Sequence, residues 1–117
     1  MSKGMSPEII ELIAWEISDQ LARQDYEALV MRCANTRLTA SDLRNAVLEY
    51  GRKLESPPKD AYQNLDAIEI KNKVSPTWSV QIPVWTREEG RSDLTLELTV
   101  SLVNNLPHIE LDDLHVL

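Results

Sequence analysis

The sequence predicts an α+β fold in which three N-terminal helices pack on one face of a curved, mostly antiparallel sheet of four strands. Apolar residues of the first half recur at every third or fourth position, which is the spacing of one helix face. Towards the C-terminus every second residue is apolar, and the residues between are polar; the apolar ones are Leu94, Leu96, Leu98, Val100 and Leu102. A period of two is typical of a strand with one buried face.

The length of the chain fits a single domain, since domains most often contain about 100–150 residues. We expect a helical half over residues 6–55, a linker over residues 56–61 and a sheet half over residues 62–117. Cys33 is the one cysteine, which excludes an internal disulfide and is typical of a reducing compartment, so we expect a cytoplasmic protein. The first residues predict neither a signal peptide nor a membrane span.

The formal net charge is −7, from 19 acidic and 12 basic side chains. Nucleic-acid affinity depends mainly on Lys and Arg side chains that neutralise phosphates. Here the basic residues are scattered, and the longest cluster is Arg52-Lys53. We therefore expect no nucleic-acid partner, whereas a negative surface would steer encounter with a basic partner.

The first two helices are predicted from their start signals and apolar stripes. Residues 6–8 (Ser-Pro-Glu) combine a capping hydroxyl, a proline whose missing N–H costs nothing, and an acid near the positive helix end. Asp25 can cap the second, short helix. The predicted stripes are Ile10, Ile13, Ile17 and Leu21, widened by Ile9 and Leu12, followed by Tyr26, Leu29, Val30 and Cys33.

The third helix has the clearest end signals. Thr39 followed by Asp42 resembles a capping box. Gly51 either ends the helix or lets it fray, and Pro57-Pro58 forbids its continuation. Its apolar stripe is Leu43, Ala46, Val47, Tyr50 and Leu54.

The second half predicts a meander of strands joined by short turns. Pro83 has no N–H for a ladder, so it belongs at an edge or a bulge. Residues 88–90 (Glu-Glu-Gly) suit a turn with a left-handed glycine, and residues 104–107 make the next reversal. The apolar positions before the Leu94 row are Ala67, Ile68 and Ile70, led by Tyr62 and Leu65, and then Trp78, Val80, Ile82 and Val84.

The last strand changes its apolar face at Asp112-Asp113. Ile109 and Leu111 occupy odd positions, whereas Leu114 and Val116 occupy even ones. One inserted residue, a β-bulge, restores the phase and turns all four apolar side chains towards apolar surroundings. The bulge serves either sheet curvature or a nearby site.

The same segment supplies the first candidate site, because two carboxylates and an imidazole lie within residues 112–115. A regular strand sends Asp113 and His115 to one face and Asp112 to the other. Zinc sites use three or four protein ligands, and no third ligand is visible, so we expect no metal. Asp113 and His115 are kept as candidate contacts of a ligand or partner.

The second candidate is the charged hairpin tip at residues 85–93. Arg87 or Arg91 can bind a carboxylate bidentately, beside the flat surface of Trp85. Alternatively these arginines pair with Glu88, Glu89 or Asp93 and order the turn. Sequence reasoning prefers the second interpretation for the charges. The candidate contacts at this tip are Trp85, Arg87, Arg91 and Asp93.

Aromatic residues supply the third candidate. Helix faces with Tyr26 and Tyr50 would meet the sheet face with Trp78, and Trp15 completes the set. These residues either pack the core or line a pocket between helices and sheet. Cys33 is expected to be a buried thiol rather than a nucleophile. The sequence has no glycine-rich phosphate loop, C-x-x-C, H-E-x-x-H or G-x-S-x-G motif, so no cofactor is expected.

Two resemblances add to these residues. Residues 85–96 and 111–117, with residues 25–30 and 38–40, resemble a family of small uncharacterised bacterial proteins, a domain of unknown function. That family has no assigned activity, so it transfers no catalytic residue. The order of helix, short helix, helix and curved sheet is similar to the nuclear transport factor two-like superfamily, which includes polyketide-cyclase-like enzymes.

This second resemblance implies a cone-shaped α+β fold that often dimerises and can hold a ligand in the cone. Some members are enzymes, and many are binding modules, including immunity proteins of bacterial toxin systems. The Asp–His catalytic pairs of the enzymes have no counterpart here, because His108 and His115 both fall in the last ten residues. Function inferred from a fold alone is analogy.

We therefore expect a non-catalytic binding or protein-interaction module that forms a homodimer. The expected interface is the polar sheet face, with Trp85 near its centre or rim, unless Trp85 covers the sheet edge within one chain. The alternatives are a small-molecule pocket enzyme of the cyclase or isomerase kind, and an acidic immunity-type inhibitor of a basic toxin. A cavity above roughly 300 Å³ with convergent polar groups would favour a pocket, and a filled core would favour interaction.

Overall fold

The computed structural model describes residues 7–33 and 36–117 of the chain, so the predicted cap at Ser6 lies outside the described residues. Three helices precede four strands, as the sequence predicts. The elements are α1 (Pro7–Ala22), α2 (Tyr26–Arg32), α3 (Ala40–Tyr50), β1 (Ala67–Glu69), β2 (Thr77–Thr86), β3 (Gly90–Val103) and β4 (Leu106–Val116).

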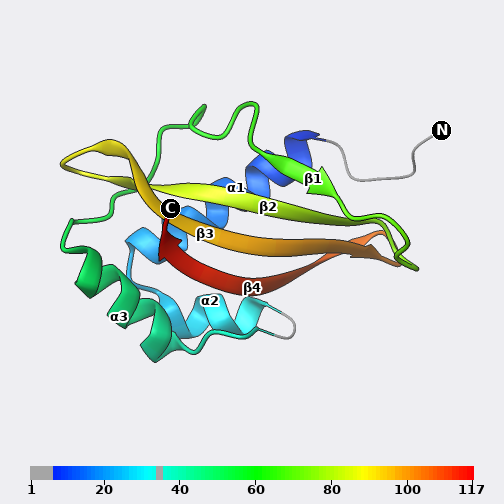
Figure 1. The fold of residues 1–117 in the computed structure, drawn as a ribbon, viewed down its shortest axis with the longest axis horizontal. Coiled ribbons are helices and arrows are strands. Elements are labelled where there is room, and N and C mark those ends of the chain that lie inside the picture. The colour runs from blue at the N-terminus through cyan, green and yellow to red at the C-terminus, as the bar shows by residue number, and fades with distance from the viewer. Residues whose placement is uncertain (1–6, 34–35) are drawn as a thin grey trace.

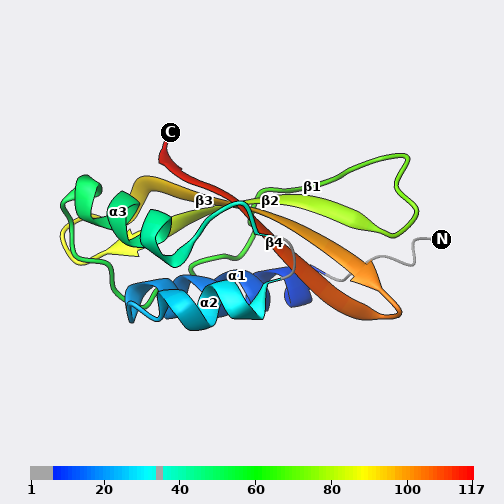
Figure 2. The ribbon, with the colours of Figure 1, turned by 90° about the horizontal axis from the view of Figure 1, so that it is seen from below.

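The four strands form one antiparallel sheet in the order β1-β2-β3-β4, which is a simple meander. Helices α1 and α2 lie behind this sheet in Figure 1, and the edge-on view in Figure 2 shows both of them on the same side. Helix α3 lies beside β4, near the end of the sheet where the β2–β3 hairpin turns. No described helix covers the opposite side of the sheet, which we call the open face.

The core lies between α1, α2 and the sheet. The alternating rows of β2 and β3 are buried as predicted, and Leu96 and Leu98 are completely inaccessible. On α1 the stripe of Ile10, Ile13, Ile17 and Leu21 is buried.

The prediction that Ile9 and Leu12 widen this buried stripe is wrong. Ile9 is 45% exposed and Leu12 is 57% exposed. Each lies one residue, or about 100° around the helix, from a buried isoleucine. That rotation turns both side chains away from the sheet.

The helix ends follow the sequence with one exception. Thr39 Oγ1 accepts the Asp42 N–H (3.0 Å), while Asp42 Oδ2 accepts the Thr39 N–H (2.9 Å), which is the predicted capping box. Gly51 ends α3 in the left-handed conformation, with φ of 75°. Asp25 does precede α2, but its side chain makes no capping hydrogen bond.

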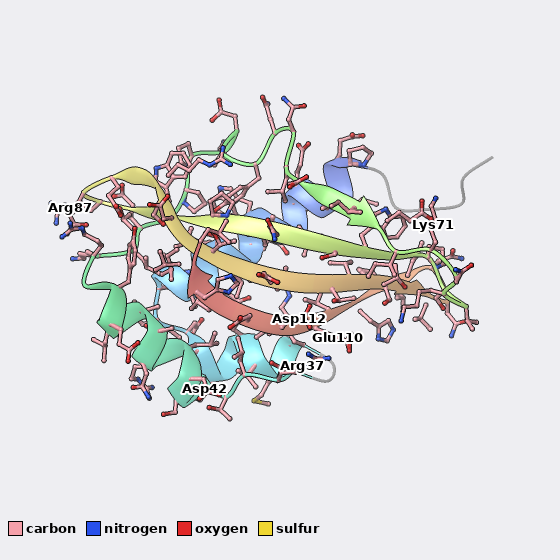
Figure 3. The ribbon with its side chains drawn as sticks, viewed as in Figure 1. Arg37, Asp42, Lys71, Arg87, Glu110 and Asp112 are labelled. Carbon is pink, nitrogen blue, oxygen red and sulfur yellow. The ribbon has the colours of Figure 1, made fainter. Side chains whose placement is uncertain are left out.

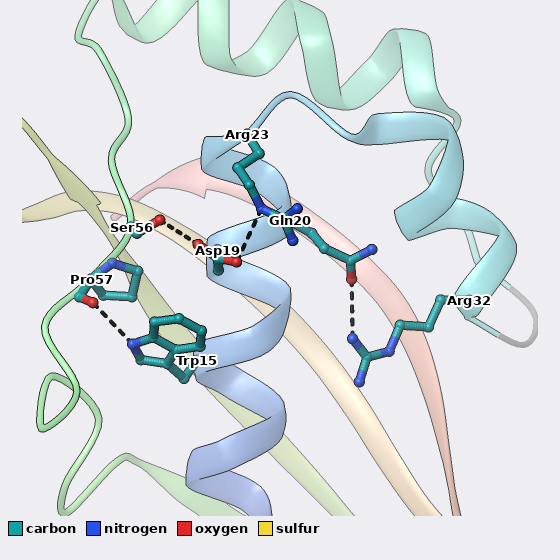
Figure 4. A network of polar contacts seen from close by, with 7 residues as sticks. All are labelled: Trp15, Asp19, Gln20, Arg23, Arg32, Ser56 and Pro57. Carbon is teal, nitrogen blue, oxygen red and sulfur yellow. Dashed lines mark hydrogen bonds and ion pairs between the residues drawn. The ribbon is translucent and has the colours of Figure 1, made fainter.

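Side-chain hydrogen bonds tie the segment after α3 to α1. Trp15 Nε1 donates to the carbonyl oxygen of Pro57 (2.9 Å), and the Ser56 hydroxyl donates to Asp19, as Figure 4 shows. Figure 4 also shows Arg32 of α2 bonded to Gln20 of α1, at 3.1 Å. The contacts of Trp15 and Asp19 hold the linker along the helical layer, and the Arg32–Gln20 bond joins α2 to α1.

The residues between α3 and the linker are paired with the end of β2. Leu54 was predicted in the stripe of the third helix, but it lies beyond Gly51 and forms an isolated antiparallel bridge with Thr86. On either side of it, the Glu55 N–H donates to Trp85 O (3.0 Å) and the Arg87 N–H donates to Lys53 O (2.8 Å). Residues 53–55 therefore extend the sheet at the hairpin tip.

The predicted bulge in β4 is confirmed. Leu111 pairs with Leu98 and Asp113 pairs with Glu97, so Asp112 is the extra residue. Ile109, Leu111 and Leu114 are buried, as the restored phase requires. The prediction that Val116 is also turned towards apolar surroundings is wrong, because its side chain is 55% exposed. Val116 ends an edge strand, which has a paired strand on one side only.

The turns confirm the remaining sequence signals. Gly90 has a φ of 72°, and Asn104 and Asn105 form the β3–β4 turn with φ values of 53° and 63°. The β2–β3 register shifts between Pro83 and Trp85, where the proline was expected at a bulge or edge. None of the helices in the described part of the chain is long and apolar enough to span a membrane.

Candidate functional site

The open face places polar side chains of three strands in rows. Pairing of β2, β3 and β4 aligns Gln81 with Glu97 and Asp113. The next row contains Pro83, Thr95 and His115. The sequence pattern predicts this face, because the polar members of each alternating strand share it.

His115 lies close to two carboxylates on this face. Its Nε2 lies 3.1 Å from Glu97 Oε2, and its Nδ1 lies 2.9 Å from Asp113 Oδ2. The bulge also brings Asp112 to this side, where its Oδ2 accepts the Thr99 hydroxyl at 2.6 Å. Strict alternation would send Asp112 to the opposite face, so the inserted residue is what gathers both aspartates.

Within residues 7–33 and 36–117, no three His, Cys, Asp or Glu side chains are arranged to hold a metal ion. His115 instead contacts Glu97 across the strand pair. That contact could have been found from sequence, because a two-residue turn at Asn104-Asn105 plus one bulge fixes Glu97 opposite Asp113.

A hollow of about 500 Å³ lies beside this cluster, between the open face and residues 61–66. Gln81, Pro83 and Thr95 belong to the sheet side of it, and Tyr62 belongs to the loop side. Residues 91–93 and Leu117 complete its lining. The hollow lies on the side of the sheet opposite to the pocket that the aromatic residues suggested.

Charged and polar groups converge on this hollow. Arg91, Asp66 and Asp93 all line it and are exposed. None of the three makes an ion pair within the part of the chain that the structure describes. Thr95 is only 2% exposed, and its hydroxyl donates to the Asp93 carbonyl oxygen at 3.2 Å. Thr95 is therefore part of the packed base, not a freely exposed contact.

Tyr62 holds the loop side of the hollow in place. Its hydroxyl donates to the Pro83 carbonyl oxygen and is hydrogen-bonded to the Ser18 hydroxyl, each at 2.9 Å. Burial raises the pKa of Tyr62 to about 12, against smaller opposing effects of the Ser18 hydrogen bond and the Arg91 charge. The phenol is thus a neutral structural donor at ordinary pH. Sequence reasoning saw Tyr62 only as a residue leading into β1.

The charges of the hairpin tip do not pair as the sequence suggested. Glu89 accepts the hydroxyls of Tyr50 (2.8 Å) and Thr86 (3.0 Å), and Glu88 accepts the Lys53 backbone N–H (3.1 Å). Arg87 and Arg91 make no ion pair with Glu88, Glu89 or Asp93 among the described residues. The interpretation that these arginines order the turn is wrong, because neutral donors occupy the glutamates.

Trp85 is half-buried and lies against its own hairpin. A Cβ atom built on Gly90 would lie 3.8 Å from the indole ring, so the ring covers the glycine backbone. Trp85 and Arg91 are cross-strand partners. This arrangement leaves less of the indole available as a contact than sequence reasoning expected.

The four candidate aromatic residues do not meet in one pocket. Trp78 is buried in the core, Trp15 bonds to Pro57, and Tyr50 bonds to Glu89. Tyr26 is buried, with the Arg44 guanidinium carbon 5.3 Å from its ring centroid. Burial raises the pKa of Tyr26, and the nearby Arg44 charge partly offsets this effect. Packing in the core and at the surface therefore accounts for the positions of these four aromatic residues.

Cys33 is a buried thiol, as predicted. Burial raises its pKa to about 11, and the charge of Arg32 acts weakly in the opposite direction. A thiol with that pKa is protonated at neutral pH, which makes it a poor nucleophile.

Comparison with known proteins identifies a family without assigning an activity. No curated protein and no solved structure matches the chain. The profile of a domain of unknown function, DUF7668, matches residues 18–117, which include all elements except the first part of α1. The chain belongs to the DUF7668 family.

Proposed function

We propose that this protein is a binding module that takes a protein partner on the open face of its sheet. The observation that carries the proposal is the hollow of about 500 Å³ on a face that no described helix covers. Arg91, Asp66 and Asp93 offer charged groups there without an ion pair among the described residues. Unpaired charges around a concave, polar surface favour a specific partner.

The filled core supports this reading over an internal pocket. Ile17 of α1 and Ile82, Leu96 and Leu98 of the sheet are completely inaccessible, so side chains occupy the space between helices and sheet. A nuclear transport factor two-like architecture is part of the proposal, supported by the order of three helices and then an antiparallel sheet. A ligand held between helix and sheet, as in the cone of that superfamily, has no room at these positions.

A small-molecule ligand is the second candidate, and one observation favours it. The volume of the hollow lies within the range of about 300–1,000 Å³ that is typical of ligand pockets. The amide of Gln81 and the charges of Arg91 and Asp93 line it together. A bound metabolite would then occupy the place that we assign to a side chain of a partner.

Photo-crosslinking tests the proposed face. A benzoylphenylalanine at Ser79, on the open face, should form one covalent adduct of defined mass in the native host cells. The matched control carries the same group at Ala28, an exposed position on α2, and should form no such adduct. Absence of an adduct at Ser79, or the same adducts at both positions, would exclude a protein partner on this face. An adduct of twice the chain mass would identify a second copy.

A further inference from the structure

Resting on the proposed function, we infer that the partner of the open face is a basic protein, and that one of its lysine or arginine side chains enters the hollow between Asp66 and Asp93. The step beyond the proposed function is the chemistry of the partner. It follows from the charges of this face and from the groups that line the hollow.

Carboxylates dominate the open face and its rim. Four of them, Asp66, Asp93, Glu110 and Asp112, have no ion pair within the described residues. The other two are Glu97 and Asp113, which share His115. Figure 3 labels Glu110 and Asp112 together along β4. The surface therefore offers six acids from the β1 side of the sheet to β4.

Few basic groups oppose these acids. Arg91 lines the hollow, and Arg37 lies at the outer edge of β4, where its N–H donates to the Leu111 carbonyl oxygen at 3.0 Å. Figure 3 shows Arg37 beside Glu110 and Asp112, at the rim of the face. Lys71 lies far from this part of β4, at the distant end of the molecule. Counted over residues 7–33 and 36–117, the face keeps an excess of negative charge.

The lining of the hollow matches a cationic side chain. Asp66 and Asp93 supply carboxylate acceptors, and the side-chain amides of Asn64 and Gln81 can supply carbonyl acceptors. A lysine ammonium has three donors, and an arginine guanidinium has five. Charge-assisted hydrogen bonds of this kind are roughly twice as strong as neutral ones.

Arg91 restricts which basic partners can bind in the hollow. Its guanidinium lies in the same hollow as the two aspartates and has no ion pair among the described residues. A partner must therefore bring one acceptor, a carboxylate or a backbone carbonyl, next to its basic side chain. A basic group with no carbonyl or carboxylate acceptor beside it would meet Arg91 with like charge alone, which is a means of rejecting wrong partners.

A protein fits this arrangement better than a free small cation or a second copy. The acids lie on β3, on β4 and at Asp66 just before β1, a spread beyond the reach of a ligand that fits in the hollow. Two copies meeting through this face would oppose two sets of carboxylates, and the chain as a whole has a net charge of −7. Complementary charge instead accelerates encounter with a basic protein.

The test uses a fluorescein-labelled peptide in which lysine alternates with serine, and a counterpart with glutamate in place of lysine. Fluorescence anisotropy at low salt should show binding of the lysine peptide only. The variant Asp66→Asn with Asp93→Asn should bind it at least about tenfold more weakly. Both aspartates are exposed, so we expect the isosteric amides to preserve the fold, and circular dichroism checks this.

The control is Glu8→Gln with Glu11→Gln on α1, which changes the net charge by the same amount, from −7 to −7 + 2 = −5. Its affinity should stay within about twofold of the unmodified chain. Equal weakening of both variants would show that only net charge matters and would overturn the inference, as would preference for the glutamate peptide. An open-face adduct at Ser79 without lysine-peptide binding overturns this inference alone; no adduct at either position overturns the proposed function.

Discussion

Leu98 marks the centre of the sheet, because it is completely inaccessible in β3 and pairs with Val80 on one side and Leu111 on the other. Leu98→Ala removes buried methyl groups and leaves a cavity, so it should lower the free energy of unfolding by about 2–5 kcal/mol. The midpoint of urea denaturation measures this loss. Ser79→Ala on the open face is the control, with an expected change within about 0.5 kcal/mol. An unchanged midpoint for Leu98→Ala would contradict the assigned core.

Thr95 shows why the two faces are not a simple division into buried and exposed. Thr95 alternates with the buried leucines, and from this pattern alone the substitution Thr95→Ala would be expected to change stability little. The structure corrects this, since Thr95 is 2% exposed under the hollow and donates to Asp93. Alternation predicts which face a residue is on, but a loop far away in the sequence, residues 61–66, decides whether that face is covered there.

Cys33 offers a clean chemical test at the residue scale because it is the one cysteine of the chain. Its pKa of about 11, against an ordinary value of 9.0, lowers the thiolate fraction at pH 8 by roughly 100-fold. Alkylation by iodoacetamide at pH 8 should therefore be at least about 100-fold slower in the folded chain than in urea. Mass spectrometry follows the modification. Equal rates would contradict the buried position.

The same raised pKa has a consequence for stability. The folded state favours the neutral thiol, so the contribution of Cys33 to the free energy of unfolding is fully present below the unfolded pKa of about 9. As the pH rises from about 9 to about 11, the thiol ionises in the unfolded chain but stays neutral in the folded chain. This stabilising contribution is therefore lost over that range. Replacement by serine should flatten the pH dependence of the denaturation midpoint between those values.

The bulge of β4 is the feature that a deletion can probe at the element scale. Removing Asp112 leaves Leu111 opposite Leu98 and Asp113 opposite Glu97, which is a regular ladder. The main loss is the 2.6 Å Thr99–Asp112 hydrogen bond, and bonds to charged groups contribute about 1.5–3 kcal/mol. Removing Leu111 instead places Asp112 opposite Leu98 on the core face.

We therefore expect the chain without Asp112 to fold with a modestly lower urea midpoint and the chain without Leu111 to unfold or aggregate. Circular dichroism with urea titration compares the two deletions directly. Equal damage from both would show that the extra residue is not the bulge. A variant Asp112→Asn separates the loss of charge from the loss of the residue.

At this scale much of the sheet follows from the sequence, and the site does not. The Asn104-Asn105 turn and the phase change at Asp112 together predict the β3–β4 register, including Glu97 opposite Asp113. In β2 and β3 the pairing shifts between Pro83 and Trp85, and two extra β3 residues there have no clear sequence signal. That shift and the irregular loop at residues 61–66 shape the hollow, so tertiary packing rather than periodicity creates it.

For the molecule as a whole, the negative charge of the open face favours one proposed occupant over another. Sequence reasoning expects a homodimer through this face, with Trp85 as a hot spot, and this stays untested. Six carboxylates on each copy and an indole lying against Gly90 argue for a different partner. We expect sedimentation velocity at micromolar concentration and low salt to give a monomer. A dimer that Trp85→Asp converts to monomer, without unfolding, would restore the original prediction.

The order of elements along the chain affects how the protein is made. The three helices leave the ribosome before any strand of the sheet, although the stripe of Ile10, Ile13 and Ile17 is buried only when β2 and β3 arrive. Isolated helices of this length are marginal in water, and exposed apolar surface in an unfinished chain invites aggregation. The nascent helical half therefore exposes this stripe until β2 and β3 are made, so we expect the unfinished chain to be most prone to aggregation before Thr77 is reached.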